Sequence, residues 1–300
     1  MRRSTSFITL ATGFVIAAGT ASWLAMQAVA VVHAQEPQSF TAEDPRLAGQ
    51  PTGGVAASPP AAMAEAWEPH PTSTLPLKIL DYPHFRLGYD EQAKNPAWVA
   101  YRLSGPIAFP GQEQRPSTFV TEFRTAAHVA HRDYSNSGFD RGHLCPAYAM
   151  FSRFGEEGLK ETFIMSNVIP QYHGLNAGEW EQLESLIAGR PGQGDGWAAT
   201  LGPLWVVNGP IYDQRPAARK LANGTWIPSG CFSVVLCQRE GRWQALSFVM
   251  PNQKDVAGPV SRYLTTIGSI DHDTALDLLA GMPSTPSNVL RSDRAMQVWR

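Results

Sequence analysis

Residues 138–146 read Gly-Phe-Asp-Arg-Gly-His-Leu-Cys-Pro, a short stretch that holds an aspartate, an arginine and a histidine between and beside two glycines. The imidazole of His143 titrates near neutrality and can take a proton from water, whereas the guanidinium of Arg141 suits phosphate oxygens. A histidine in such a setting is more often a structural hydrogen-bonder. The stretch therefore needs support from the residues around it.

A second polar stretch follows, with Met-Ser-Asn-Val-Ile-Pro-Gln at residues 165–171 and Leu-Asn-Ala-Gly-Glu-Trp-Glu-Gln-Leu-Glu at residues 175–184. If residues 176–188 form one α-helix at about 100° per residue, Asn176 and Glu184 share the apolar face of Trp180. An inward amide and carboxylate need a partner because unpaired buried polar groups are costly. A bound cation, held directly or through water, would supply one. The remaining polar residues of the helix are expected in solvent: Glu179, Glu181, Gln182 and Ser185.

Simpler interpretations of the same residues stay open. Asn176 could be a helix N-cap, with Glu179 completing a capping-box pair. Glu184 could instead form a salt bridge with an arginine, and Asn167 could be a turn residue at a strand end.

Short β-type runs bounded by glycine, proline and asparagine indicate strands at residues 98–103, 163–169, 204–212, 231–238 and 243–250. Several follow one another without a helical crossover, which favours an antiparallel sheet. Helical patterns cover residues 176–188 and 273–279. The expected class is α+β, with a central antiparallel sheet and flanking helices.

Together these stretches resemble the DNA/RNA non-specific endonuclease family of the ββα-metal fold. The matching residues are the Asp-Arg-Gly-His signature at 140–143, Ser-Asn and Pro-Gln at 166–171, and Leu-Asn leading to Trp and Leu-Glu at 175–184. Looser similarity covers most of residues 76–285. At Phe163, some family members have a second asparagine, so that support is absent here.

The resemblance implies a role for each matched residue. His143 corresponds to the general base and Asn176 to the direct magnesium ligand. Glu184 is similar to the carboxylate that orients metal-bound water, and Asn167 to the amide beside the site. Arg124 matches, more loosely, the arginine that stabilises the transition state.

Two further residues of the signature are expected to hold substrate or brace the loop. Arg141 would contact phosphate or brace it, and Asp140 would brace it too. The implied activity is hydrolysis of DNA and RNA to 5′-phosphate products with a single Mg²⁺, for which Mn²⁺ is a substitute. An alternative is a catalytically weak, exported nucleic-acid-binding module on the same fold.

Composition limits how such a protein meets a polyanion. The chain has 24 Lys and Arg against 26 Asp and Glu, a formal charge of −2. Whole-molecule attraction is therefore excluded and phosphate binding must be local. A site that grips phosphate, sugar and metal reads no base edge, so both DNA and RNA can enter.

The first 75 residues are expected to lie outside the catalytic domain. Residues 7–32 are apolar after Arg2 and Arg3, which indicates a signal peptide within residues 1–34 or an uncleaved membrane anchor. Export to the periplasm or outside the cell is the expected location, with a mitochondrial transit segment as the alternative. Residues 35–75 read as a disordered Pro- and Ala-rich linker. Residues 286–300 form a C-terminal tail without an assigned role, and a homodimer is a further expectation.

Two rival chemistries use other residues. Cys145 could act as a nucleophile beside His143. Three cysteines are an odd number, and Cys231 and Cys237 on one strand would be too far apart to pair, so buried free thiols are the simpler interpretation. A zinc site is the second rival, with candidate ligands His128, His131, His143 and His173.

Overall fold

The computed structural model describes residues 68–213, 215 and 217–299. The expected signal or anchor at 1–34, and all but the last eight residues of the expected linker at 35–75, lie outside this range. Within the described residues, no helix is both long and apolar enough to cross a bilayer.

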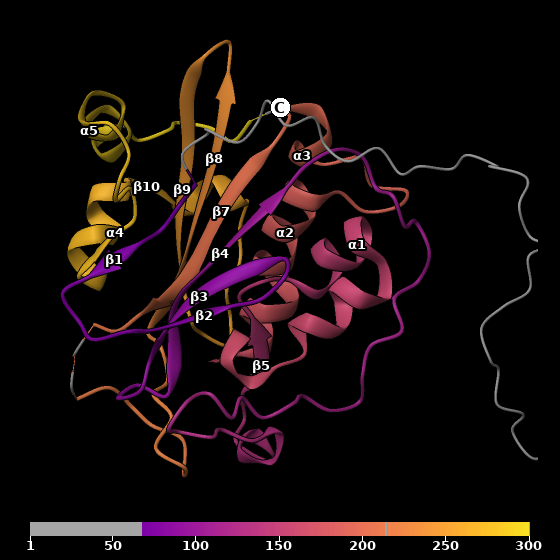
Figure 1. Ribbon diagram of the computed structural model, residues 1–300, viewed down its shortest axis with the longest axis vertical. Coiled ribbons are helices and arrows are strands. Elements are labelled where there is room, and N and C mark those ends of the chain that lie inside the picture. The colour runs from indigo at the N-terminus through magenta and orange to yellow at the C-terminus, as the bar shows by residue number, and fades with distance from the viewer. Residues whose placement is uncertain (1–67, 214, 216, 300) are drawn as a thin grey trace, which may run out of the picture. The chain divides into compact units, whose positions relative to one another are not determined.

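A seven-stranded antiparallel sheet forms the centre of the fold, in the order β10-β9-β8-β7-β4-β3-β2 (Figure 1). Its strands are β2 (Lys78–Asp81), β3 (Phe85–Asp90), β4 (Asn95–Leu103), β7 (Leu204–Ile211), β8 (Gly230–Arg239), β9 (Arg242–Pro251) and β10 (Leu264–Thr265). The expected antiparallel sheet is thus confirmed. Its two longest strands pair from Gly230 with Pro251 to Arg239 with Arg242.

Helices cover the sheet on both faces (Figure 1). One face carries α1 (Ala147–Thr162), α2 (Trp180–Ala188) and α3 (Trp197–Thr200), and the other carries α4 (Ile267–Thr274) and α5 (Ser284–Ser292). Because both faces are covered, β7 and the first eight residues of β8 are buried and mostly apolar, without regular polar alternation. Alternate residues of β8 enter the two cores, Val235 on the α1–α3 side and Val234 on the α4–α5 side.

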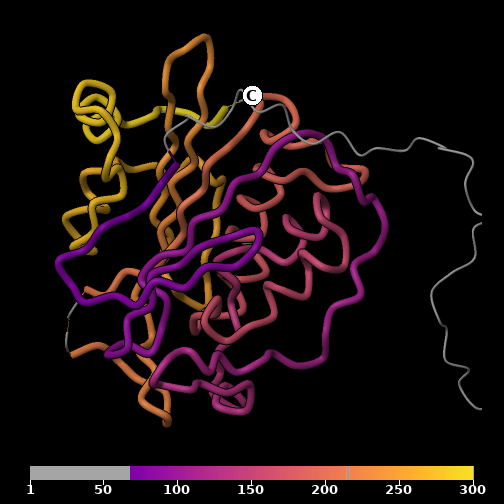
Figure 2. Tube along the Cα trace, viewed as in Figure 1, coloured from indigo at the N-terminus to yellow at the C-terminus, as the bar shows by residue number. Residues whose placement is uncertain are grey.

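Two small sheets stand beside the large one. β5 (Asp140–His143) pairs with β6 (Val168–Gln171), and β1 (Thr72–Ser73) pairs with β11 (Leu276–Asp277). Short helical turns complete the fold: η2 (His131–Tyr134), η3 (Met165–Asn167), η4 (Leu175–Glu179) and η5 (Val260–Tyr263). The trace in Figure 2 shows the long irregular segment between β4 and β5, which contains only η2.

Several expected elements differ from the structure. The strand expected at 163–169 is η3 followed by β6, because residues 165–167 form a helical turn that reverses the chain before pairing begins. The helix expected at 273–279 is wrong: α4 ends at Thr274, where Ala275 takes a left-handed conformation with φ of 57°, and β11 follows. The sixteen-residue α1 has no counterpart among the expected elements, because Gly155, at φ of 67°, interrupts its pattern.

The ordered fold also extends past the expected domain boundaries. β1 lies inside the expected linker, because its pairing with β11 fixes residues 72–73. At the other end α5 crosses residue 285, and Trp299 stacks edge-on against Trp197 with ring centroids 5.3 Å apart. The expected tail therefore packs on the fold.

Candidate active site

The β5–β6 pair and the helical segment after it form a β-β-α unit around the Asp-Arg-Gly-His stretch. Asp140 lies opposite Gln171, and His143 lies opposite Val168. Gly142 is required between them, because a Cβ at this position would lie 1.9 Å from Oε1 of Gln171. The glycine thus leaves room for the buried side chain of Gln171, and β6 leads directly into η4 and α2.

A cavity of about 350 Å³ opens over this unit. It brings together five of the residues expected from the sequence: Asp140, Arg141, His143, Asn176 and Glu184. Two other expected residues, Arg124 and Asn167, do not line it. The rest of the wall includes Arg115, Phe119, His131, Tyr148, Phe163, Glu181 and Arg190.

His143 packs against two aromatic rings that also contact each other, with their centroids 4.7 Å apart. Its ring centroid lies 5.0 Å from that of Phe119 and 4.9 Å from that of Phe163, and its Nε2 atom is buried without a hydrogen-bond partner. Burial, with a smaller contribution from Arg115, lowers the pKa of His143 to about 3. The imidazole is therefore neutral at physiological pH. Phe163, where some family members have asparagine, packs against the ring of His143.

Asn176 lies in a π-helical turn rather than in a regular α-helix. Residues 175–179 form η4, whose Gly178 departs from helical geometry, and α2 begins only at Trp180. The Nδ2 of Asn176 donates to Oδ2 of Asp140 at 3.0 Å. This hydrogen bond fixes the amide so that Oδ1 remains available for another partner. The capping interpretation of Asn176 is wrong, because neither η4 nor α2 has a side-chain cap.

The break between η4 and α2 corrects one expectation from the helical wheel. Glu179 was expected in solvent, but it is only 5% exposed and its Oε2 is buried without a partner. A π-helical turn holds more residues per turn than an α-helix, so it rotates Glu179 inward. Within regular α2 the wheel is confirmed, because Leu183 and Ile187 are buried and Glu184 faces the cavity.

Glu184 is a half-buried carboxyl whose pKa is raised to about 8, because burial disfavours its charged form. Arg190 opposes this rise only partly. Among the described residues no ion pair joins Glu184 to an arginine, so the alternative of a salt bridge is not observed. A desolvated carboxyl in a cavity wall is typical of a functional site.

Replacing Glu184 with glutamine should change how stability depends on pH. Because the folded pKa lies above the unfolded value of 4.5, the stabilising contribution of Glu184 is full below pH 4.5 and is lost as the pH rises through about 8. In the presence of chelator, the unfolding free energy of Glu184→Gln relative to that of the wild type should increase by roughly 1–2 kcal/mol as the pH is raised from 5 to 9. Urea unfolding across this range measures the difference. For the exposed control Glu157→Gln on α1, the plot of unfolding free energy against pH should run parallel to that of the wild type. A parallel plot for Glu184→Gln would refute the raised pKa of Glu184.

Asp140 and Arg141 hold the site together. Oδ2 of Asp140 accepts from Asn176 and contacts Nδ1 of His173 at 2.8 Å. Arg141 donates through Nε and Nη2 to the carbonyl of His131 and lies over the ring of Tyr134. The bracing role expected for Asp140 agrees with this geometry. Arg141 both braces the loop and lines the cavity.

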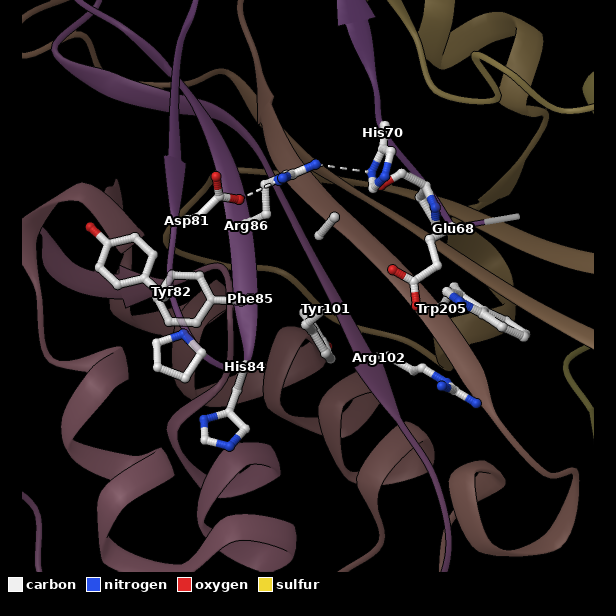
Figure 3. Close-up of a pocket in the computed structure, with 13 residues that line it drawn as sticks. Glu68, His70, Asp81, Tyr82, His84, Phe85, Arg86, Tyr101, Arg102 and Trp205 are labelled. Atoms are coloured by element: carbon white, nitrogen blue, oxygen red, sulfur yellow. Dashed lines mark hydrogen bonds and ion pairs between the residues drawn. The ribbon is translucent and has the colours of Figure 1, made fainter. Parts of the chain in front are cut away.

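Arg124 lies at a different place. Its guanidinium pairs with Glu122, donates to the carbonyl of Asp81 and lies 4.7 Å from the centroid of the Tyr82 ring. Tyr82 and Asp81 line a second cavity of about 400 Å³, next to Arg86 (Figure 3). The weakest of the sequence matches therefore lies outside the candidate site.

Arg115 and Arg190 are cavity arginines that the sequence did not single out. Arg115 contributes to lowering the pKa of His143, so its charge is felt at the imidazole. Arg190 lies 4.1 Å from the ring centroid of Tyr148 and donates to Glu181 at 3.2 Å. No local pattern marks either residue, because Arg115 lies in the irregular segment before β5 and Arg190 follows the glycine that ends α2.

Asn167 supports the site from beneath. It is fully buried, its Oδ1 accepts from the amide of Cys145 at 2.8 Å, and its Nδ2 donates to the carbonyls of Cys145 and Thr162. These bonds fix the backbone at Cys145, two residues after His143, and Asn167 does not line the cavity.

Asn167→Ala should lower the free energy of unfolding by roughly 3 kcal/mol, because it leaves an amide and two carbonyls without partners. Asn167→Asp should cost more, because a carboxylate would face the carbonyls of Cys145 and Thr162. Urea unfolding measures both, with exposed Asn288→Ala on α5 as control. An Asp variant as stable as the wild type would contradict this hydrogen-bond assignment.

The rival sites find little support in the geometry. All three cysteines are buried and free, and burial raises the pKa of Cys145 well above its usual value, so its thiol is unsuited to nucleophilic attack. His131 and His143 line one cavity, but His128 packs against Phe123 elsewhere. Across residues 68–299, apart from 214 and 216, no three His, Cys, Asp or Glu side chains are grouped to hold a metal.

Comparisons with known proteins agree with this architecture. A family model described as DNA/RNA non-specific endonuclease matches residues 68–285. Bovine mitochondrial endonuclease G is 32% identical over 200 residues, and mitochondrial nuclease EXOG of Danio rerio is 30% identical over 188. These matches cover 63% and 57% of this chain, and they span 65% and 51% of the two relatives.

A solved structure of the EndoG/EndoGI complex has the same fold. Its TM-score to this chain is 0.57 at 22% sequence identity, and the match covers 69% of this chain and 88% of the other.

Proposed function

Because this chain belongs to the DNA/RNA non-specific endonuclease family, a generally metal-dependent group of nucleases, we propose that it hydrolyses phosphodiester bonds of DNA and RNA to 5′-phosphate products. The observation that carries the proposal is one cavity lined by a neutral histidine, an amide with a free oxygen and a desolvated carboxyl. The matches span only 65% and 51% of the two mitochondrial relatives, so their activities and substrates come to this chain as part of the proposal.

His143 is the proposed general base. A neutral imidazole has one unprotonated ring nitrogen, which accepts a proton from the attacking water. The aromatic rings of Phe119 and Phe163 pack against the imidazole and limit its rotation. Asn167 holds the following peptide, so the histidine is presented in one orientation.

The donor set fits a hard divalent cation. Oδ1 of Asn176 is freed by the bond from Nδ2 to Asp140, and Glu184 lines the same cavity, where a bound cation would favour its ionised form and let it hold a water ligand. Mg²⁺ prefers oxygen ligands and keeps several waters, so one protein amide suffices. Bound there, the ion would stabilise negative charge on the leaving oxygen.

Cavity arginines are proposed to neutralise the phosphate. Arg115, Arg141 and Arg190 all line the wall. Guanidinium groups pair with phosphate oxygens through parallel hydrogen bonds. None of these contacts needs a base edge, which supports cleavage of DNA and RNA with little sequence preference.

The proposal is tested by incubating the purified chain with a plasmid and with a folded RNA, with Mg²⁺ and with chelator. Both substrates should be degraded, chelator should stop the reaction, and end-group labelling should find 5′ phosphates. Binding of both nucleic acids without cleavage under any divalent cation would favour the alternative of a catalytically weak binding module. Cleavage at a few defined sequences would contradict the lack of base readout.

The relatives' names favour a mitochondrial location over export, for which the comparisons give no support. We infer that the Arg-bearing, acid-free start of residues 1–34 acts as a transit segment. Incubation of the full chain with isolated mitochondria should give protease-protected protein, abolished when the membrane potential is dissipated. Protein that stays outside the mitochondria under both conditions would favour the predicted export instead. The membrane tether at 7–32 and the homodimer stay predictions.

A further inference from the structure

A cavity of about 490 Å³ lies directly beside the candidate active site. Two pairs of consecutive residues lie between this cavity and the active-site cavity. They are Phe139 with Asp140 and Tyr172 with His173. Phe139 stacks against Tyr172 with ring centroids 4.4 Å apart, and Asp140 contacts His173. Asp140 lines the candidate active-site cavity and Tyr172 lines the neighbouring one. Because Tyr172 packs on Phe139, the residue before Asp140, the two cavities adjoin.

Tyr172 is held in place as a flat wall. Its backbone amide donates to Oδ1 of the buried Asn252 at 2.8 Å, and Phe139 supports its ring. Gly174, two residues on, packs so closely that a Cβ there would lie 1.8 Å from the carbonyl oxygen of Lys254. The aromatic side chain is thus preorganised, and it remains half-exposed.

Two cations face the same space. Arg219 and Lys254 are exposed, line the cavity, and form no ion pair with any described residue. Nη1 of Arg219 lies 3.4 Å from the hydroxyl of Tyr172, so positive charge lies at the hydroxyl end of the aromatic ring. Asp213 is the one acidic residue in the described wall, which leaves the cavity net positive. Its volume lies within the range of about 300–1,000 Å³ that accepts small ligands.

We propose that this cavity binds a nucleotide flanking the scissile phosphate, with the base against Tyr172 and backbone phosphates at Arg219 and Lys254. An aromatic platform beside cations is the general arrangement for single-stranded nucleic acid, because every base has a π-face and every linkage a charge. The proposal rests on the proposed nuclease function. It also explains how a chain with net charge of −2 holds a polyanion, since the attraction is confined to the groove beside the site.

The test measures binding of a fluorescein-labelled 20-nucleotide DNA by anisotropy in chelator, with the strand checked for integrity on a gel. Arg219→Gln/Lys254→Gln should raise Kd at least tenfold and lower the slope of log K against log salt by about 1.4, since each single-strand phosphate contributes roughly 0.7. Tyr172→Ala should raise Kd roughly fivefold to a hundredfold, whereas Tyr172→Phe should not.

The matched control removes the same charge elsewhere. Arg239→Gln/Arg242→Gln lies at the tip of the β8–β9 hairpin, ten residues and about 30 Å along the sheet from the cavity (Figure 1). It should leave Kd and salt slope unchanged. If both double variants match the wild type, the subsite is refuted while plasmid cleavage by the wild type still supports the nuclease. If both weaken binding equally, the attraction is diffuse and the subsite is also refuted. A wild type that neither binds nor cleaves refutes the proposed function.

Discussion

Replacing His143 with alanine should lower the rate of phosphodiester cleavage by about 10²–10⁴-fold, the usual contribution of a positioned general base. The geometry makes this residue hard to replace. Phe119 and Phe163 pack against the imidazole, and burial lowers its pKa to about 3, so the ring is neutral across the working pH range. Steady-state cleavage of a plasmid and of an RNA measures the loss on both substrates.

The contrast between kcat and binding separates catalysis from damage to the fold. Because the imidazole acts on water rather than on the substrate's backbone, His143→Ala should keep its Kd for DNA within about threefold. Exposed His272→Ala on α4, on the opposite face of the sheet, should cleave like the wild type. A His143→Ala protein that folds and retains more than a tenth of the wild-type rate would remove the histidine from the mechanism.

Sequence patterning was most successful where one physical constraint acts locally. β7 and most of β8 are predominantly apolar because both faces of their sheet are covered, so they could be identified as strands from the sequence alone. Glu184 faces the cavity because α2 is a regular helix from Trp180, and the 3.6-residue period holds there.

The pattern was less successful where tertiary contacts override local preference. The π-helical turn at 175–179 turns Glu179 inward, which no regular period could indicate. Asn167 lies in a stretch that the sequence singled out. Its burial and its hydrogen bonds to the backbone depend on how the chain packs after α1. The sequence thus identified the relevant residues of η3 and η4, but their geometry is known only from the folded structure.

The arginine assignment shows the same division. Arg124 lies before the signature stretch and loosely matches the arginine that the family resemblance implies. Arg115 is farther away and lies in a segment without periodicity. Only the packed structure shows that Arg115 reaches the cavity of His143, whereas Arg124 is consumed by its pairing with the buried Glu122. Substitutions of the two arginines are therefore expected to have opposite effects on activity and stability.

Arg115→Ala should lower kcat by about 10²–10³-fold, the effect of removing one preorganised charge that faces the transition state. Its stability should change little, because the side chain is half-exposed and pairs only with nearby Glu113. Arg124→Ala should do the reverse. It removes the cation beside Glu122, a carboxyl only 5% exposed, whose pKa is lowered to about 2 against the opposing effect of burial by hydrogen bonds from Arg124 and Tyr82.

Because half of Arg124 is exposed, the loss on removing it should be about 1–2 kcal/mol of unfolding free energy rather than that of a fully buried pair. Cleavage kinetics and urea unfolding on both variants form a two-by-two comparison. Arg115→Lys, which keeps the charge but not the planar fork, should recover part of the rate. The opposite outcome, with Arg124→Ala slow and stable and Arg115→Ala active, would restore the sequence assignment and place the phosphate nearer the cavity in Figure 3.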